Sequence, residues 1–521
     1  MNRRTFLAAA STLAMPSIAR AQGAVLRFVP QADVAVLDPI WTTSYQTRDH
    51  AFLVFDTLYG QDGSYAAQPQ MVAGAVTEPD GLRWELKLRP GLRFHDGTPV
   101  LARDCVASIR RWGARDTFGQ ALLAATAELS APDDATILFR LHRPFPLLPD
   151  ALAKTSPSPC VIMPERLAAT DAFKQVSEMV GSGPYRFLPD ERVPDARVSY
   201  GRFDGYVSRE GGEPSRTAGP KRATFERVEW TVIQDAATAS AALARGEVDW
   251  WLVANPDLLG RLRADRRLQV RTQDPTGIIG TMRFNQLHPP FDNPVMRRAV
   301  LSAVVQSEYM QAVSGPDRTL WADGVGYFCP GTPLASAVGM DAMKGSLDAG
   351  RRAIEAAGYK GERVMLMMPT DIPSVLALAE VTADLFRKLG LNLDAQTMDW
   401  GTAVQRRTNM EPPDRGGWSV FQTSWSGLDH VNPAGHPFLR GNGRAAAPGW
   451  AVSPTLEMLR DQWLQATDLA AQKALAERMQ AQAFIDVPYV PLGQQFQQTA
   501  HRAELSGILP GMPVFWNVKR G

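Results

Sequence analysis

The sequence has few cysteines, no excess of basic residues and no long apolar run, and each of these absences excludes a class of protein. Only 3 of its 521 residues are cysteine, too few for disulfides to carry the fold. Lys and Arg number 55 against 54 Asp and Glu, whereas a nucleic-acid binder normally carries a basic excess. No stretch approaches the ~20 consecutive apolar residues that a membrane-spanning helix needs. We therefore expect a globular protein that neither binds nucleic acid nor spans a membrane.

Motifs of catalysis and metal binding are also missing. The sequence has no HExxH, CxxC, GxSxG or P-loop pattern. Residues 441–446 fit GxGxxA, but they follow no strand pattern, so we interpret them as loop glycines. His430 and His436 do not share a helical face at their spacing, which favours structural histidines over a metal pair. These absences predict no cofactor and no bound metal, and they favour a protein that is not an enzyme.

The three cysteines, Cys105, Cys160 and Cys329, match no metal motif. In an exported chain two of them could form a disulfide and leave an odd thiol. Because free cysteine is among the most buried residue types, we favour a core thiol at each position.

An export signal precedes an ordinary globular composition. Arg3-Arg4 precedes a short apolar run, and Ala19-Arg20-Ala21 closes it with a small-x-small pattern. We predict a signal peptide over 1–21, of the twin-arginine type, rather than the alternative of a buried N-terminal helix. No cysteine stands at the cleavage point, so the mature protein is expected free in the periplasm, without a lipid anchor. At one domain per ~150 residues, the chain should form about three domains.

Hydropathy patterns in the mature chain predict a mixed α/β protein. Residues 84–89 alternate apolar and polar side chains, as a half-buried strand does. Asp292-Asn293-Pro294 combines a capping residue with a proline at the first helical position, which indicates a helix start. Residues 363–396 have the pattern strand, helix, strand, and that length implies a parallel crossover.

Periodicity fails between Glu411 and Gly449, where seven glycines stand among four aromatic side chains. A long non-repetitive stretch inside a compact domain is usually functional or disordered. The aromatic residues argue against disorder, so this stretch is a candidate binding surface.

Five spaced segments carry a family resemblance. They are Leu37-Asp38-Pro39 with Asp56-Thr57-Leu58-Tyr59, the run 86–106, Gly181-Ser182-Gly183-Pro184-Tyr185, Phe284-Asn285 with the run 289–299, and Ala356-Ala357-Gly358-Tyr359. In this order they resemble the family 5 extracellular solute-binding proteins, the dipeptide and oligopeptide receptors of ATP-driven importers.

The resemblance implies an α/β, two-lobed periplasmic binding protein fold (type II, similar to cluster C) with an extra domain inserted in the first lobe. The ligand would be enclosed between the lobes by hinge closure. After the signal peptide, lobe I is expected to begin at 22–64, to receive the additional domain at 65–180 and to resume at 181–284. Lobe II is expected at 285–487, followed by a C-terminal return to lobe I at 488–521.

The resemblance also implies a ligand-binding residue within the aperiodic stretch. Peptide receptors of this family hold the α-amino group of the peptide with an Asp in a Trp-x-x-Asp-type segment, and Trp425-Ser426-Gly427-Leu428-Asp429 is the matching stretch. A buried carboxylate is unfavourable unless paired, so Asp429 in a closed cleft would require a cation. Alternatively, it is a loop Asp that bonds nearby backbone N–H groups. The sequence departs from the family's acidic–aromatic pair here, because Leu428 and His430 flank Asp429.

Aromatic and basic side chains would complete this site. Trp425 and Phe421 are candidate apolar walls of the pocket, or equally core of the lobe. Tyr45 and Trp41 would contribute from the opposite lobe.

Trp400 ends a strand-like run, where ligand sites of α/β proteins gather. Arg406 and its neighbour Arg407 are candidates for a ligand carboxylate, with a solvated helix face as the alternative.

We predict the periplasmic substrate-binding protein of an ABC importer, acting as a monomer. It would capture a small peptide or similar amine-bearing solute and deliver it to an inner-membrane ABC permease with its ATPase. Two alternatives stay open: a receptor of the same fold for an opine, a metal complex or haem, and an exported hydrolase with an unrecognised carboxylate pair.

Overall fold

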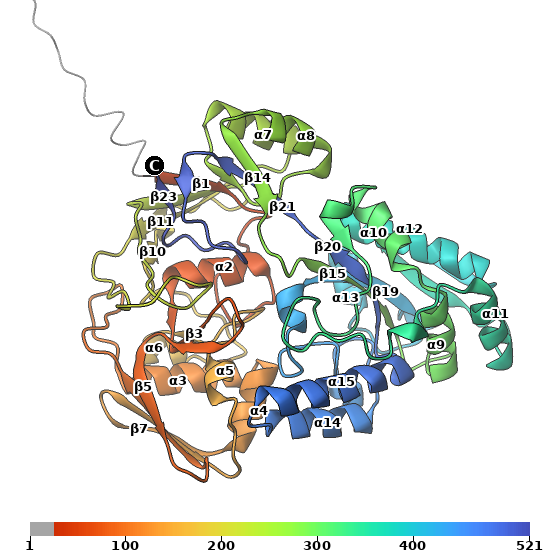
Figure 1. The fold of residues 1–521 in the computed structure, drawn as a ribbon, viewed down its shortest axis with the longest axis horizontal. Helices are drawn as coiled ribbons and strands as arrows, with labels where there is room; N and C mark the ends of the chain where they lie inside the picture. Colours follow the sequence, from red (N-terminus) through yellow and green to blue (C-terminus); the bar gives the residue numbers. More distant parts are fainter. Residues whose placement is uncertain (1–24) are drawn as a thin grey trace, which may run out of the picture.

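Three larger β-sheets organise the described part of the chain, and helices cover their faces (Figure 1). The computed structural model describes residues 25–521, so the predicted signal peptide at 1–21 lies outside the described residues. Two of the sheets draw strands from distant parts of the sequence. The third, from an early segment of the chain, forms a separate layer at the lower left of Figure 1.

The first sheet has seven strands, and β1 (Val25–Val29) lies at its centre. β1 pairs in parallel with β12 (Arg227–Thr231) and with β13 (Trp250–Trp251). The order across the sheet is β10 (Tyr185–Phe187), β11 (Arg197–Arg202), β12, β1, β13, β21 (Gln498–Arg502) and β14 (Leu268–Thr272). An early segment that begins at Val25, a middle segment and the C-terminal segment therefore build one lobe.

The core of this first lobe is aromatic. The ring of Phe28 lies 5.0 Å from that of Trp250 and 4.9 Å from that of Phe515, centroid to centroid. These side chains come from all three segments, so burying them together holds the discontinuous lobe in one piece. Helix α2 (Tyr45–Val54) packs on this lobe and begins at its border with the second.

The second sheet has six strands, ordered β16 (Trp321–Ala322), β20 (Val490–Gln495), β15 (Ile278–Phe284), β19 (Val420–Ser426), β17 (Val364–Pro369) and β18 (Leu393–Met398). The predicted strand–helix–strand unit is confirmed: β17 and β18 pair in parallel and α12 (Pro373–Lys388) connects them. The predicted helix start is confirmed as well, since the Asn293 side chain accepts a hydrogen bond from the N–H of Val295 at the start of α9 (Pro294–Ala303).

Part of the aperiodic stretch is a central strand, so reading it as non-repetitive throughout was wrong. Residues 420–426 form β19, which pairs antiparallel with β15 and parallel with β17. A strand covered on both faces has no reason to alternate apolar and polar residues. Gln422 and Thr423, for example, are both buried.

Strand pairing also differs from two of the expected lobe divisions. β15 falls in the range 181–284 assigned to lobe I, and β20 in the range assigned to the C-terminal return, yet both belong to the second sheet. The expected division at 284/285 coincides with the end of β15 rather than with a connection between the sheets. The chain passes between the two sheets at 273–277 and again at 496–497.

The inserted layer is a four-stranded antiparallel sheet with short helices. Its order is β5 (Val72–Thr77), β6 (Arg83–Leu88), β8 (Thr136–Leu141) and β7 (Thr126–Asp133). Helices α3 (Ala102–Gly113), α4 (Thr117–Ala125), α5 (Leu148–Leu152) and α6 (Glu165–Ala168) accompany it. The second lobe carries the remaining long helices, α10 (Gln306–Ser314), α11 (Leu347–Ala356), α13 (Trp400–Arg406), α14 (Pro454–Leu464) and α15 (Leu469–Asp486), and α7 (Ala236–Arg245) and α8 (Leu259–Ala264) belong to the first.

The three cysteines are free and buried, which confirms the preference for core thiols. Burial raises the pKa of the Cys329 thiol to about 12. Within residues 25–521, the structure contains no helix that has both the length and the apolar character of a membrane crossing.

Candidate ligand-binding site

One tyrosine hydroxyl joins the two lobes at their border. Tyr45 is the first residue of α2 in the first lobe, and Asp429 lies in the short turn after β19 in the second. The Tyr45 hydroxyl donates to Asp429 Oδ2 at 2.7 Å and accepts from the backbone N–H of Ser426 at 2.6 Å. The turn needs glycine at 427, because a Cβ there would lie 2.1 Å from the carbonyl oxygen of Thr276. The structure thus brings together Tyr45 and Asp429, predicted separately from the two lobes.

The carboxylate of Asp429 is buried and only half satisfied. The residue is 1% exposed, and its Oδ1 has no hydrogen-bond partner among the described residues. Burial raises its pKa, against the opposing effects of the Tyr45 and Ser156 hydroxyls and of the charges of Arg48 and Lys154. Because a buried polar atom without a partner is unfavourable, this oxygen is suited to a donor supplied by a ligand.

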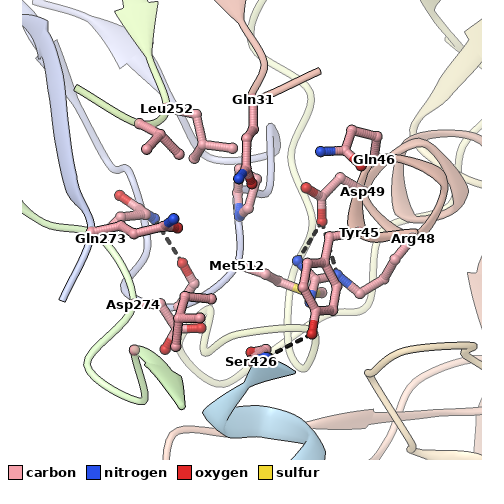
Figure 2. A pocket seen from close by; sticks show the side chains of 16 residues that line it. Gln31, Tyr45, Gln46, Arg48, Asp49, Leu252, Gln273, Asp274, Ser426 and Met512 are labelled. Carbon is pink, nitrogen blue, oxygen red and sulfur yellow. Dashed lines mark hydrogen bonds and ion pairs between the residues drawn. The ribbon is translucent and has the colours of Figure 1, made fainter. Parts of the chain in front are cut away.

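A small pocket of about 60 Å³ opens beside this contact, and we call it the acidic pocket. Figure 2 shows Tyr45, Arg48, Asp49, Asp274 and Ser426 around it, together with Gln31, Gln46, Leu252, Gln273 and Met512. The two carboxylates outnumber the single guanidinium. Since Coulomb attraction is stronger in a partly enclosed site than in water, the acidic pocket favours a cationic group.

The acids of this pocket have different surroundings. Asp49 is buried and accepts from Arg48 Nε at 2.9 Å and Nη2 at 2.8 Å, both on the same oxygen, Oδ1. Burial raises the pKa of Asp49 to about 6, with Arg48 opposing the shift and Asp274 adding to it. Asp274 uses one oxygen to accept from the backbone N–H of Thr276 at 2.9 Å. Gln273 is buried too, and its Oε1 has no partner among the described residues, which adds another acceptor.

A larger cavity of about 360 Å³ lies on the other side of the lobe contact. We call it the tryptophan cavity, because Trp41 of the first lobe and Trp425 of the second both line it. The remaining lining residues are Ile40, Thr42, Thr43, Arg115, Asp116, Thr117, Lys154, Pro157, Ser158, Gly435 and Pro437. Side chains alternate along a strand, so Trp425 lines this cavity while the next residue, Ser426, lines the acidic pocket.

Four predicted site residues line neither pocket: Asp429, Phe421, Trp400 and Arg406. Asp429 is buried behind the acidic pocket and is joined to its lining through the bond to Tyr45. Phe421 is fully buried and stacks on Trp400 with the ring centroids 5.8 Å apart, as part of the core of the second lobe. Arg406 donates to the carbonyl oxygens of Gly416 and Gly417, at 3.1 and 3.0 Å. Its guanidinium therefore fixes a loop of the second lobe, and is neither a free carboxylate receptor nor a fully solvated helix face.

The two histidines of the aperiodic stretch, His430 and His436, lie next to each other in the interior of the protein. Their ring centroids lie 4.4 Å apart and both side chains are buried. His436 uses both ring nitrogens: Nδ1 accepts from the N–H groups of Phe438 and Leu439, and Nε2 contacts the Tyr327 carbonyl at 3.0 Å. In the part of the chain that the structure describes, no three His, Cys, Asp or Glu side chains gather as a metal site.

Several residues that line the two pockets were not predicted from the sequence. Arg48 and Asp49 follow Tyr45 on α2, and Asp274 lies where the chain passes between the sheets. Arg115 and Lys154 come from the inserted layer, which carried no expected site residue. Arg48 and Asp49 could have been predicted only from their position, because they lie within four residues of the predicted site residue Tyr45.

Two mixed sheets, joined by repeated chain crossings and enclosing pockets between them, define a two-lobed binding protein. The chain belongs to the bacterial extracellular solute-binding proteins, family 5, whose model for the middle part of the family matches residues 66–444. The predicted family is therefore confirmed, and as a member the chain is a solute-binding component of a transporter, not an enzyme.

Known relatives cover nearly the whole chain. The probable peptide ABC transporter periplasmic-binding protein y4tO of Sinorhizobium fredii is 35% identical, over 99% of this chain and 98% of its own length. The glutathione-binding protein GsiB of Pectobacterium atrosepticum is 23% identical, over 98% of this chain and 96% of its own.

Solved structures confirm the predicted fold class. AgaA of A. tumefaciens R10, in complex with agropinic acid, superposes with a TM-score of 0.77 at 19% identity, covering 95% of this chain and 99% of that one. DppA of Helicobacter pylori, in complex with the peptide STSA, gives a TM-score of 0.74 at 19% identity, covering 97% of this chain and all of that one. At these identities the likeness establishes the fold, that of the cluster C binding proteins.

Proposed function

We propose that this chain captures a small peptide or a similar amine-bearing solute between its lobes and delivers it to an inner-membrane ABC permease driven by its ATPase. The observation that carries the proposal is the excess of carboxylate where the lobes meet. Asp49 and Asp274 line the acidic pocket with a single guanidinium, that of Arg48. The buried Asp429 lies next to it, bonded to Tyr45, where the charges of Arg48 and Lys154 act on it. The names of y4tO and GsiB, which concern a peptide transporter and glutathione, support the same class of solute.

The ammonium group would complete the hydrogen bonding of Asp429. Tyr45 occupies Oδ2, so the amine would donate to the unpartnered Oδ1 while its charge offsets the buried carboxylate. Asp49 and Asp274 would strengthen the attraction from the acidic pocket. Trp41 and Trp425 would provide the apolar walls. Phe421, Trp400 and Arg406 would act only by stabilising the second lobe.

We further propose where the protein works and how it reaches that place. The pattern at 1–21 supports export by the twin-arginine route, with the mature protein free in the periplasm and monomeric. The description of y4tO as periplasmic supports the same compartment.

The proposal is tested by identifying the solute that the protein carries. Mature protein is purified from its native host, denatured, and the released small molecules are identified by mass spectrometry. The same is done for Asp429→Asn and for Asp461→Asn, a matched control at an exposed position of α14. We expect amine-bearing solutes, peptides above all, from the wild type and the control, and their loss from Asp429→Asn.

Two other outcomes would distinguish the role of Asp429 as the anchor from the proposed class of solute. Peptides retained by a folded Asp429→Asn variant would leave the receptor standing and remove Asp429 as the anchor. A released solute without an amine, such as an anionic metal complex, would overturn the proposed solute class.

A further inference from the structure

The tryptophan cavity contains a guanidinium without a counter-charge. Arg115 lies half-buried between α3 and α4, with its guanidinium carbon 4.9 Å from the ring centroid of Trp41 and 5.2 Å from that of Phe173. Its hydrogen bonds are long and reach only carbonyl oxygens, of Trp41 at 3.3 Å and of Ala172 at 3.4 Å. Among the described residues, no carboxylate pairs with Arg115.

The other two charged side chains that line the cavity, Lys154 and Asp116, pair with each other. The Lys154 ammonium pairs with Asp116 Oδ2, and both side chains are buried. The second oxygen of Asp116 accepts from the N–H groups of Phe118 and Gly119, at 2.9 and 3.2 Å, and so caps α4. Lys154 and Asp116 cancel each other, which leaves the cavity with the positive charge of Arg115.

The walls also suit a planar or apolar body attached to an anion. Trp41 and Trp425 approach from opposite lobes, and indole rings supply a large apolar contact area together with an N–H donor. The guanidinium, held against the face of Trp41, is oriented before any ligand arrives. At about 360 Å³, the cavity lies within the range of small-molecule sites.

We propose that the tryptophan cavity binds a carboxylate of the solute, with Arg115 as the residue that pairs with it and the two indoles packed on the attached group. The inference rests on the proposed function for its other half, the amine at Asp429 and the acidic pocket. Trp425 and Ser426 are consecutive residues of β19 that line the two pockets from opposite faces of the strand. The inference gives the solute a carboxylate in addition to the amine proposed at Asp429.

The cavity can be tested without knowing the natural solute. The probes are 3-phenylpropionate and its neutral amide, whose binding is measured by ligand-observed NMR titration. The proteins are the wild type, Arg115→Gln, Arg115→Lys and Arg110→Gln, the last a matched control at an exposed arginine of α3. Since hydrogen bonds to charged groups are about twice as strong as neutral ones, we expect the acid to bind at least about tenfold tighter than the amide in the wild type and in Arg110→Gln.

The ratio of the two affinities decides the matter. It should fall to about one in Arg115→Gln and be partly kept in Arg115→Lys, which retains the charge and guards against a folding defect in the first variant. Equal binding of acid and amide by the wild type, binding of neither, or a ratio unchanged in a folded Arg115→Gln would each overturn the inference.

The proposed solute class and the proposed role of Arg115 in the cavity can be refuted independently of each other. Asp429→Asn should weaken an amine-bearing peptide and leave phenylpropionate unaffected. A wild type that binds no peptide but selects phenylpropionate over its amide would refute the proposed solute class and support the role of Arg115. Peptide binding that is indifferent to amidation of the C-terminus and to Arg115→Gln would do the reverse.

Discussion

The Tyr45 hydroxyl donates to Asp429 Oδ2 at 2.7 Å, although the two residues are 384 positions apart and belong to different lobes. Both side chains sit where the solute is proposed to bind, yet they use only one carboxylate oxygen between them. The protein therefore holds its lobes together with an internal bond and still leaves an acceptor for the solute. Under the proposed function, closure of the lobes and binding of the solute would use the same carboxylate.

Removing this hydroxyl should favour opening of the lobes. Tyr45→Phe leaves Asp429 Oδ2 and the N–H of Ser426 without their partner, and an unsatisfied buried group costs about 1–3 kcal/mol. The loss falls on the closed conformation, because the bond crosses between lobes. We expect a larger radius of gyration in small-angle X-ray scattering of the solute-free protein, and weaker solute binding.

The chain offers a matched control for this variant. Tyr206 donates to Asp56 Oδ2 at 2.9 Å inside the first lobe, so Tyr206→Phe removes the same kind of bond without touching closure. It should lower the unfolding free energy and leave the radius of gyration unchanged. Identical scattering and affinity for Tyr45→Phe and wild type would show that the bond does not hold the lobes.

The Leu-Asp-Pro segment near the mature N-terminus has a structural role that can be measured. Asp38 accepts two hydrogen bonds from Arg111 of α3, at 3.1 and 2.7 Å, with both side chains at most 2% exposed. Arg111→Met would leave a buried carboxylate uncompensated, which costs about 3–5 kcal/mol. Urea unfolding should show this loss.

Neutralising the acid should restore some of that stability. The double variant Asp38→Asn with Arg111→Met buries no charge, so it should unfold at higher urea than Arg111→Met alone. As a comparison, Arg351→Met removes an exposed pair with Asp348 and should cost at most about 1 kcal/mol. Equal effects of the buried and exposed replacements would contradict this account.

Stability should fall on mild acidification because burial lowers the pKa of five imidazoles. The pKa falls to about 3 for His50 and to about 4 for His95 and His430, and it is also lowered for His436 and His501. An unfolded histidine takes up its proton near pH 6.5. Between pH 6.5 and about 4 the unfolded chain thus binds protons that the folded chain does not, and stability decreases as the pH falls.

Five carboxyl groups oppose this trend. Burial raises the pKa of Asp49 and of Asp150 to about 6, and it also raises those of Asp104, Asp249 and Asp429, so the folded state gains protons there as the pH falls. Carboxyl groups whose pKa is lowered by hydrogen bonds, such as Asp265, act in the same direction as the histidines. His50→Gln should reduce the dependence of the unfolding free energy on pH by up to about 1.4 kcal/mol per pH unit near pH 5. His142→Gln, at an exposed position, is the control. Urea titrations at pH 5.0 and 7.5 measure both, and an unaltered slope in His50→Gln would contradict the assignment.

Local patterns in the sequence were sufficient for some elements and not for others. The crossover of β17, α12 and β18 was predictable because each piece has its own periodicity and Gly390 follows the helix. β19 was not, since burial on both faces removes the alternation that marks a strand.

In the candidate site, too, some residues were predictable from the sequence and others were not. Asp429 was suggested by the family resemblance, and Tyr45 and Trp41 by their position near Leu-Asp-Pro. Their contacts, and the roles of Arg48 and Arg115, depend on which segments the fold brings together, and chain separations of hundreds of residues leave no local trace of that.

Solute binding itself should depend on pH through Asp49. Its pKa in the solute-free protein is raised to about 6 by burial, and a cationic solute in the acidic pocket favours the ionised form. Affinity should therefore be full above about pH 7 and decrease as the pH falls through 6, by up to about tenfold per unit. Calorimetric titration at pH 5.0 and 7.5, with the solute that the wild type releases, measures this change in affinity.

Two variants test the role of Asp49. Asp49→Asn should bind the solute weakly at both pH values. Asp150→Asn, which removes an acid of similar pKa outside the acidic pocket, should keep the wild-type dependence. The same decrease in affinity in Asp49→Asn would place the titrating group elsewhere and separate the acidic pocket from recognition of the amine.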